Sequence, residues 1–577
     1  MKPETRARRA SNSSDLTAAA TLTAEETNKD TGSDHPYLTW RVFMMGLLVS
    51  LGGFIFGYDA GQIAGFIVMK AFRRRFGERD PAKDEYYLPD TRAGLFVSVL
   101  SIGGLFGALI AGPVANRFGR RKPITFWCLI YIVGIIIQIS SSTKWQQIVI
   151  GKAIGGLGVG ALSITVPLYQ SETAPTHIRS SVLCLFQIYI TFGILLANIV
   201  NYPSSHITST ASWRIAMGIG FLAPLLLGLS ILLFPESPIY AYRNNAIPSA
   251  AITMTKLLGV SSQFHPTINF ELAQLQKKLD SENGRGQKKR AWHEFVTGPS
   301  MLHRTLLGVS LMAFQQLSGA NFFLYYGTAL FSTAGIESPF ITQIILVSVN
   351  LVCTLPGLYF VSHFSRRKCL IVGGLVMSTF LLIFASVGHF VLLRGQPKGE
   401  GLPGSANFTQ EHRKEAGTVM IVFASLFIAT FASTWGPMVW SSVAELYPSR
   451  YRATCIGLAT ASNWMIAFYI AFCTPFIISE IDYLYGYVFA GTCAAASVTV
   501  YFFLMESQGR GLEELDNMYL AKVKPWQSAK WIAPLDHDTV ERERKGSTRV
   551  KEDGIESIPE SPVRERDDGV VQGTETV

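Results

Sequence analysis

The sequence predicts an all-α membrane protein in which twelve transmembrane helices form two pseudo-symmetric six-helix bundles. Three observations lead to this fold class. Only 16% of the 577 residues are charged and 49% are hydrophobic, whereas about 25% charge is typical of soluble domains. Apolar stretches of about 20 residues, the length that crosses a bilayer core, recur along the chain. Landmark residues of the first half also recur in the second half.

The charged residues fall mainly in the gaps between apolar stretches, and this spacing delimits the predicted helices. A helix satisfies its own backbone hydrogen bonds, which allows it to cross hydrocarbon. Each stretch is therefore expected to form one transmembrane helix. The twelve predicted spans are 41–69, 93–115, 123–142, 147–169, 181–201, 213–235, 304–331, 339–361, 369–393, 418–440, 453–476 and 484–505.

Polar segments at both ends and in the middle divide the chain into five regions. The tails are polar and charge-mixed, so they offer too little apolar surface to fold alone. No cleavable signal peptide is visible, so the first span is the expected insertion signal and the N-terminus stays in the cytosol. We expect a disordered cytosolic N-terminal tail (1–40), an N-terminal six-helix bundle (41–235), a cytosolic linker with short helices (236–303), a C-terminal six-helix bundle (304–506) and a mostly disordered cytosolic C-terminal tail (507–577).

Basic residues in the short loops favour this orientation, because Lys and Arg tend to remain on the cytosolic side. The loop after the first span departs from that rule, since it carries seven basic residues between Lys70 and Arg92. A second outer loop contains the sequence Asn407-Phe408-Thr409. Its expected outer position makes Asn407 a candidate glycosylation site.

The landmarks that repeat are charged residues at the cytosolic ends of corresponding helices. Two homologous bundles related by an axis along the membrane normal explain the repeat. In such proteins one half rocks against the other and opens a site near the bilayer midplane to each side in turn. The repeated elements are Arg120-Arg121-Lys122 and Arg366-Arg367-Lys368, Glu172 with Arg179 and Glu445 with Arg452, and Glu236-Ser237 and Glu506-Ser507.

These charges have two interpretations. They can form ion pairs that hold the two halves together on the cytosolic side, or they can be solvated helix ends that mark the inner face. The repeated seven-residue spacing from Glu to Arg favours an inner gate. The predicted inner-gate charges are Arg117, Arg120, Glu172, Arg179, Glu236, Arg366, Glu445, Arg452 and Glu506.

Two charges lie in the middle of apolar spans, Asp59 in the first and Lys152 in the fourth. Each is unfavourable there by about 2.5 to 3.5 kcal/mol on insertion scales, so we expect them to pair. The seventh span carries the amides of Gln315, Gln316 and Asn321, which must face protein or water. A neutral polyhydroxylated ligand is bound by amides and aromatic rings, which need neither charge nor metal.

Short motifs within the first span and after the second, sixth and last spans resemble those of a known family. They are Phe56-Gly57-Tyr58-Asp59-Ala60-Gly61, Gly119-Arg120-Arg121, Pro235-Glu236-Ser237-Pro238 and Gly509-Arg510-Gly511-Leu512-Glu513-Glu514. Together they resemble the sugar porter family of the major facilitator superfamily, over about residues 40 to 520. The stretches 61–66 and 169–175 resemble filamentous-fungal hexose transporters and their glucose-sensor relatives.

The resemblance implies the major facilitator fold and transport of a monosaccharide, glucose or another hexose, by alternating access. It implies a multi-pass protein of the plasma membrane with both termini in the cytosol, and no cofactor, metal or nucleic acid. The alternative that each amide only joins neighbouring helices stays open. The sugar contacts that the resemblance implies are Gln187, Gln315, Gln316, Asn321, Asn350, Trp440, Asn463 and Trp464.

The resemblance gives Asp59 and Lys152 a role in proton coupling or gating, because proton-coupled members pair an Asp with an Arg at these positions. Here Lys152 replaces the Arg, which removes a bidentate partner. Proton symport, facilitated diffusion and a purely structural pair all remain open. Asn116 and Ser362 stand where the family has Asp, which is expected to weaken the inner gate.

Two classes of function remain. One is a hexose transporter and the other is a sugar receptor of the same fold that signals through its tails without net transport. The expected partners are the sugar, membrane lipid, protons if transport is coupled, and cytosolic regulators of the tails. A soluble enzyme is excluded by composition. The stretch Gly156-Leu157-Gly158-Val159-Gly160 lies inside an apolar span, so it is expected to allow close helix packing and not to bind a nucleotide.

Overall fold

The computed structural model describes most of the chain between Trp40 and Trp531. The predicted glycosylation site, Asn407, lies outside the described residues. The chain divides into two compact units, of which the first, 1–529, contains the helical bundles and the second, 530–577, has only Lys530 and Trp531 described. The described ranges are 40–80, 85–174, 179–244, 246–258, 300–333, 339–393, 410–447, 452–510 and 512–531, with Gly298 and short pieces between 268 and 276.

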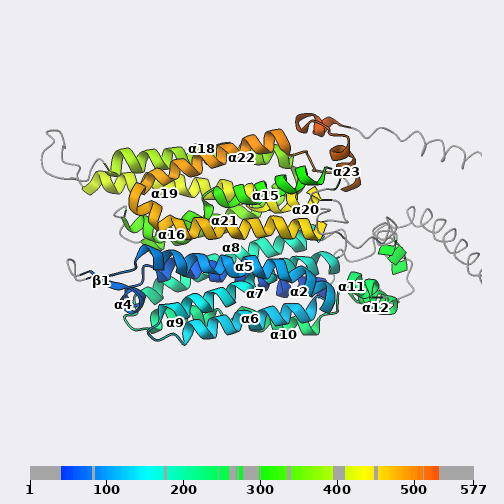
Figure 1. Cartoon of the computed structure of the whole chain (residues 1–577), viewed down its shortest axis with the longest axis horizontal. Helices are drawn as coiled ribbons and strands as arrows, with labels where there is room; N and C mark the ends of the chain where they lie inside the picture. Colours follow the sequence, from blue (N-terminus) through cyan, green and yellow to red (C-terminus); the bar gives the residue numbers. More distant parts are fainter. Residues whose placement is uncertain are drawn as a thin grey trace, which may run out of the picture. The chain divides into compact units, whose positions relative to one another are not determined.

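The N-terminal half contains six helical spans, which are drawn from blue through cyan in Figure 1. The first and the sixth are each built from consecutive helices that follow one another across a short break. In order, the spans are α2 (Trp40–Val49) with α3 (Leu51–Phe66), α5 (Asp90–Phe118), α6 (Arg121–Ile139), α7 (Trp145–Thr173), α8 (Arg179–Ser205), and α9 (Ala211–Ile219) with α10 (Leu222–Ser230) and the 3-10 turn η1 (Ile231–Leu233).

The C-terminal half contains six more spans. The seventh and the tenth are interrupted, and the ninth ends in a π-helical segment. In order, they are α15 (Met301–Leu317) with α16 (Ala320–Thr333), α17 (Pro339–His363), α18 (Arg366–Val387) with η2 (Gly388–Leu393), α19 (Gln410–Ser433) with α20 (Trp435–Leu446), α21 (Arg452–Ile481), and α22 (Tyr485–Phe503) after the 3-10 turn η3 (Asp482–Leu484).

Ten helical runs among the described residues are long and apolar enough to cross a membrane. One of these runs, Cys455–Phe503, contains both α21 and α22. The α15–α16 span is missing from the ten because its interruption leaves helices of only 17 and 14 residues. Counting α21 and α22 separately and adding α15–α16 gives the twelve predicted spans.

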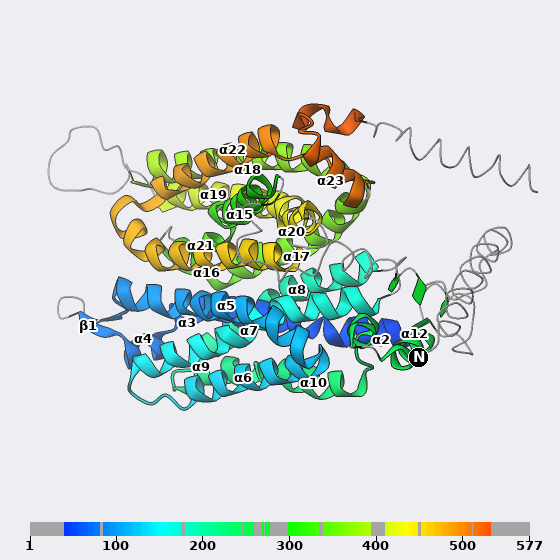
Figure 2. The ribbon, with the colours of Figure 1, turned by 45° about the vertical axis from the view of Figure 1, so that its right-hand side comes forward.

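The two ends of the bundles carry different elements (Figure 2). The hairpin end carries α4 (Lys70–Phe76) and the antiparallel strands β1 (Glu78–Asp80) and β2 (Glu85–Tyr87), in which Arg79 pairs with Tyr86. The linker end carries the remaining short helices. They are α11 (Pro238–Arg243) and α12 (Ile247–Leu258) of the linker, and α23 (Leu512–Leu520) and η4 (Pro525–Lys530) after the last span.

Glycines allow the helices of the N-terminal half to touch backbone to backbone. A Cβ added at Gly57 of α3 would lie 1.9 Å from the Ile190 carbonyl oxygen of α8. On α7, a Cβ at Gly160 would lie 2.1 Å from the Gly104 carbonyl oxygen of α5. Small residues at such contacts are the main way in which helices associate in hydrocarbon. The packing role predicted for the glycines between 156 and 160 is therefore confirmed.

The basic loop after the first span uses its arginines to satisfy carbonyl oxygens at the hairpin end. The Nε of Arg73 donates to the Ile67 carbonyl at 2.6 Å. Arg92 donates to the Phe76 carbonyl at 3.0 Å and pairs with Glu78 at 2.7 Å. Arg73 and Arg92 therefore have local structural roles at an end where the loop-charge rule predicts few basic residues.

Part of the sequence after the last span is folded against the C-terminal half. Arg304, at the start of α15 and 1% exposed, pairs with Asp516 of α23 at 2.6 Å. Its guanidinium lies 4.5 Å from the centre of the Tyr519 ring. The Ser528 hydroxyl, in η4, accepts from the Glu506 backbone N–H at 3.0 Å. Residues 512–529 thus form a C-terminal clasp, in which Leu515, Met518 and Tyr519 of α23 are buried.

The Arg304–Asp516 pair predicts an asymmetric effect on stability. Asp516 is 30% exposed and can be hydrated alone, whereas Arg304 cannot. Asp516→Ala therefore leaves an unpaired buried charge and should lower the free energy of unfolding by about 3 kcal/mol. Arg304→Met should be less destabilising. Thermal unfolding of the purified protein in detergent measures both, with Glu78→Ala at the Arg92–Glu78 pair, whose side chains are 24% and 49% exposed, as the control. Equal losses in the two variants would contradict this account.

Candidate functional site

The interrupted seventh span presents three of the predicted sugar-binding amides. α15 ends at Leu317 and α16 begins at Ala320, and Gly319 between them has a φ of +89°. A Cβ there would lie 2.7 Å from the Phe489 ring, so both the backbone conformation and the space require glycine. The break places Gln315 and Gln316 before it and Asn321 after it.

These amides join Asn463 of α21 in one hydrogen-bonded network. The Nε2 of Gln316 donates to the Asn463 Oδ1 at 2.8 Å, and the Asn463 Nδ2 donates to the Gln315 Oε1 at 3.0 Å. The Asn321 Nδ2 donates to the Gln316 Oε1. Four of the eight predicted sugar contacts are therefore brought together by the fold.

The two glutamines have different surroundings. Gln315 is 6% exposed, and its Nε2 donates to the carbonyls of Trp435 at 3.0 Å and Gly436 at 2.9 Å. Its donors are thus used to hold the start of α20. Gln316 and Asn321 are partly exposed, and one N–H of Gln316 remains after its bond to Asn463. Gln316 and Asn321 are the amides that can reach a ligand.

The other predicted contacts do not join this network within the described residues. Asn350 of α17 is 5% exposed, whereas Gln187 of α8 and Trp440 of α20 are partly exposed. Trp464 of α21 packs into the N-terminal half. Its ring centre lies 5.1 Å from that of Phe56, and a Cβ at Gly104 would lie 2.8 Å from the ring. In this structure Trp464 connects the two halves.

Asp59 and Lys152 form the predicted ion pair inside the N-terminal half. The Lys152 Nζ donates to the Asp59 Oδ1 at 2.8 Å, and both side chains are 1% exposed. Gln62, one turn after Asp59 on α3, donates its Nε2 to the same oxygen at 2.5 Å. Tyr131 of α6 and Tyr325 of α16 are close enough to interact electrostatically with the carboxyl group. Tyr325 comes from the other half of the molecule.

Arg120 and two glutamates form a buried network at the linker end of the N-terminal half. Arg120, 2% exposed, pairs with Glu172 at 2.8 Å through one amino group and donates its Nε to the same carboxylate at 2.9 Å. Its backbone N–H donates to Glu236 at 2.9 Å. Gly119, with a φ of +94°, makes room for Glu236, because a Cβ there would lie 2.6 Å from the carboxylate.

The same network is found at the linker end of the C-terminal half. Arg366 pairs with Glu445, and its backbone N–H donates to Glu506 at 3.1 Å. Ser365 caps the start of α18 by accepting from the Lys368 N–H at 3.4 Å and donates its hydroxyl to Glu506. Each described ion pair of the predicted inner gate thus joins helices of one half, which accounts for the repeated sequence landmarks.

The remaining predicted gate residues are less defined. Arg117 stacks its guanidinium 5.5 Å from the Phe118 ring centre, and its carbonyl accepts from the Tyr240 hydroxyl at 3.2 Å. Arg179 and Arg452 begin α8 and α21, and their side chains lie outside the described part of the structure. Asn116, which replaces the family's Asp, still accepts from Arg120 at 3.5 Å.

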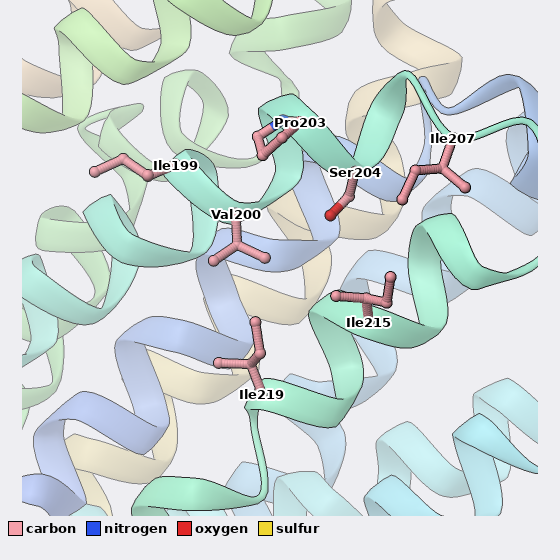
Figure 3. A pocket seen from close by; sticks show the side chains of 7 residues that line it. All are labelled: Ile199, Val200, Pro203, Ser204, Ile207, Ile215 and Ile219. Atoms are coloured by element: carbon pink, nitrogen blue, oxygen red, sulfur yellow. The ribbon is translucent and has the colours of Figure 1, made fainter.

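An apolar hollow lies away from these polar sites, between α8 and α9 (Figure 3). Ser204 is the one polar side chain among those that line it, and Ile199, Ile215 and Ile219 at its edge are more than a third exposed. A surface of this kind suits lipid and offers too few polar groups for a sugar. We therefore do not assign the sugar site to this hollow.

Sequence reasoning did not identify Gln62, Tyr131 or Tyr325. Gln62 could have been found, because it lies three positions after Asp59 and this spacing places both on one face of a helix. The two tyrosines come from other helices, and their approach to Asp59 depends on how α6 and α16 pack. No local pattern indicates that approach.

Known proteins match this chain over its helical part. The family model described as "Sugar (and other) transporter" matches residues 45–519. The low-affinity glucose transporter of Kluyveromyces lactis is 38% identical over 86% of this chain and 87% of its own length. The high-affinity fructose transporter ght6 of Schizosaccharomyces pombe is 38% identical over 90% and 95%. The galactose transporter of Saccharomyces cerevisiae is 39% identical over 85% and 83%.

Solved structures show the same fold. The xylose transporter XylE from E. coli, in a partially occluded inward open conformation, superimposes with a TM-score of 0.65 at 22% identity, over 82% of this chain and 99% of that one. A second XylE structure, of a major facilitator superfamily protein bound to 6-bromo-6-deoxy-D-glucose, gives a TM-score of 0.67 at 23% identity, over 83% and 99%. The chain therefore belongs to the sugar transporter family and has the twelve-helix fold of the major facilitator superfamily.

Proposed function

We propose that this protein transports a hexose across the plasma membrane by alternating access, with Gln316 and Asn321 among its sugar contacts and Asp59 as its proton-binding group. The amide network at the break of the seventh span carries the proposal. It offers neutral donors and acceptors from α15, α16 and α21, the chemistry that sugar hydroxyls require. The matched relatives are named as transporters of glucose, fructose and galactose.

The contacts between the two halves support alternating access. At the hairpin end, Tyr326 and Ala471 of the C-terminal half join a buried cluster with Phe66 and Trp213 of the N-terminal half. A Cβ at Gly94 of α5 would lie 2.7 Å from the Phe472 carbonyl oxygen of α21. The contact between halves at this end is therefore tight.

The linker end is more open along the same helix. Gly112 lies about five turns after Gly94, on the same face of α5, and a Cβ there would meet nothing within 4 Å. The same is true of Gly457 near the start of α21. With the linker end in the cytosol, as basic loop residues favour, this arrangement is an inward-facing state. Opening the hairpin end and closing the linker end would complete the cycle.

The surroundings of the two glutamines predict different effects of their removal. Gln316→Ala should raise the KM for hexose uptake at least tenfold with a nearly normal amount of protein at the cell surface, because Gln316 is partly exposed and keeps one N–H for a ligand. Gln315→Ala should mainly reduce the surface amount, since three protein hydrogen bonds are lost. Labelled-hexose uptake in transporter-null cells, normalised to surface protein, separates the two effects. An unchanged KM in Gln316→Ala would remove this residue from the sugar site.

The proposed coupling predicts that Asp59→Asn abolishes uphill accumulation and leaves sugar exchange intact. A proton carried with the sugar lets the membrane potential contribute about 2.3 kcal/mol per 100 mV, and the amide cannot take up that proton. Accumulation and exchange are measured in the same cells with and without an uncoupler. If wild-type hexose uptake is unchanged by uncoupler and by external pH, the result would support passive diffusion. A wild type that moves no hexose at normal surface levels, and whose loss alters sugar-responsive gene expression, would support the receptor alternative.

A further inference from the structure

The Asp59 carboxyl group is bonded asymmetrically. Two hydrogen bonds end on its Oδ1, one from Lys152 at 2.8 Å and one from Gln62 at 2.5 Å, and the Tyr131 hydroxyl also interacts with the carboxyl group. Oδ2 is buried and has no hydrogen-bond partner among the described residues. One oxygen is therefore held by two donors and the other is free to accept a proton.

Gln62 is itself firmly placed. It is 2% exposed, and its backbone carbonyl accepts from the Asn201 Nδ2 of α8 at 3.1 Å. Close contact between α3 and α8 at Gly61 and Gly65 prevents α3 from turning away from α7. The packing of α3 against α8 thus holds the Gln62 amide in place beside Asp59.

The groups around Asp59 divide into those that titrate and one that does not. Lys152 of α7 is the charged neighbour, and Tyr58 of α3, Tyr131 of α6 and Tyr325 of α16 are the titratable ones. Gln62 donates a hydrogen bond at every pH. Its contribution to the carboxylate does not depend on another group's protonation, which makes it suited to set the pH at which Asp59 binds a proton.

We propose that Gln62 is a positioning residue for proton binding, which occupies Oδ1 together with Lys152 and leaves Oδ2 as the oxygen that receives the proton. The inference rests on the proposed function, because it assumes that Asp59 couples sugar to protons.

The test replaces the donor and keeps the volume, with Gln62→Met. The variant removes one of the two donors that hold the charged carboxylate, so proton-driven uptake should persist at less acidic external pH. The external pH at half-maximal hexose uptake should rise by about one unit. The sugar KM measured at low pH should stay within about twofold of wild type, which a general disturbance of the bundle would not produce.

The matched control is Gln138→Met. Gln138 is a buried amide in the same half, 1% exposed, and its Nε2 donates to the Gly134 carbonyl at 3.2 Å. It should leave the pH midpoint unchanged. If Gln62→Met does not reach the cell surface, Gln62→Asn, which withdraws the amide by one methylene, should shift the midpoint in the same direction.

The outcomes separate this inference from the proposed function. A raised midpoint in the Gln62 variant alone supports it. If wild-type uptake depends on pH and the Gln62 variant has the same external pH at half-maximal uptake, the positioning role is overturned. Coupling through Asp59 then remains in place. A wild type whose uptake is independent of pH overturns the coupling proposal, and the role of Gln62 with it.

Discussion

Hydrocarbon solvates no polar group, and this constraint governs the structure. Each charge or amide inside a span must find a partner in the protein. The Asp59–Lys152 pair, with both side chains 1% exposed, is the strictest case. The close packing of α3 on α8 and of α7 on α5 holds the two side chains together. The buried ion pair therefore depends on the glycines that let these helices approach closely.

The same constraint explains why the two halves repeat an arginine network at the linker end. In each half an arginine pairs with a glutamate and donates its backbone N–H to a second glutamate that follows the last span. Each network ties three helices of one half into a rigid unit. A half that is tied together in this way can rock as one body. The amides at the break of the seventh span lie near the interface between the halves, where such a motion would change their surroundings.

Much of this could be predicted from the sequence, because hydropathy and repeated landmarks report on burial directly. The twelve spans follow from apolar length, and the Asp59–Lys152 pair follows from the unfavourable energy of isolated charges. The division of labour between Gln315 and Gln316 could not be predicted, since adjacent amides differ only in what the fold places beside them. The folded clasp at 512–529 was also missed, because its polar composition hides the few apolar side chains of α23 that are buried.

We propose that the protein itself moves a hexose and that an inward proton gradient drives this transport. Purified protein in liposomes tests both points without other cellular components. Labelled glucose or another hexose should enter by counterflow against preloaded sugar, and an imposed proton gradient, acidic outside, should raise the internal sugar concentration above the external one. The proposal would be contradicted if the purified protein binds hexose but liposomes that contain it take up no more hexose than protein-free liposomes do.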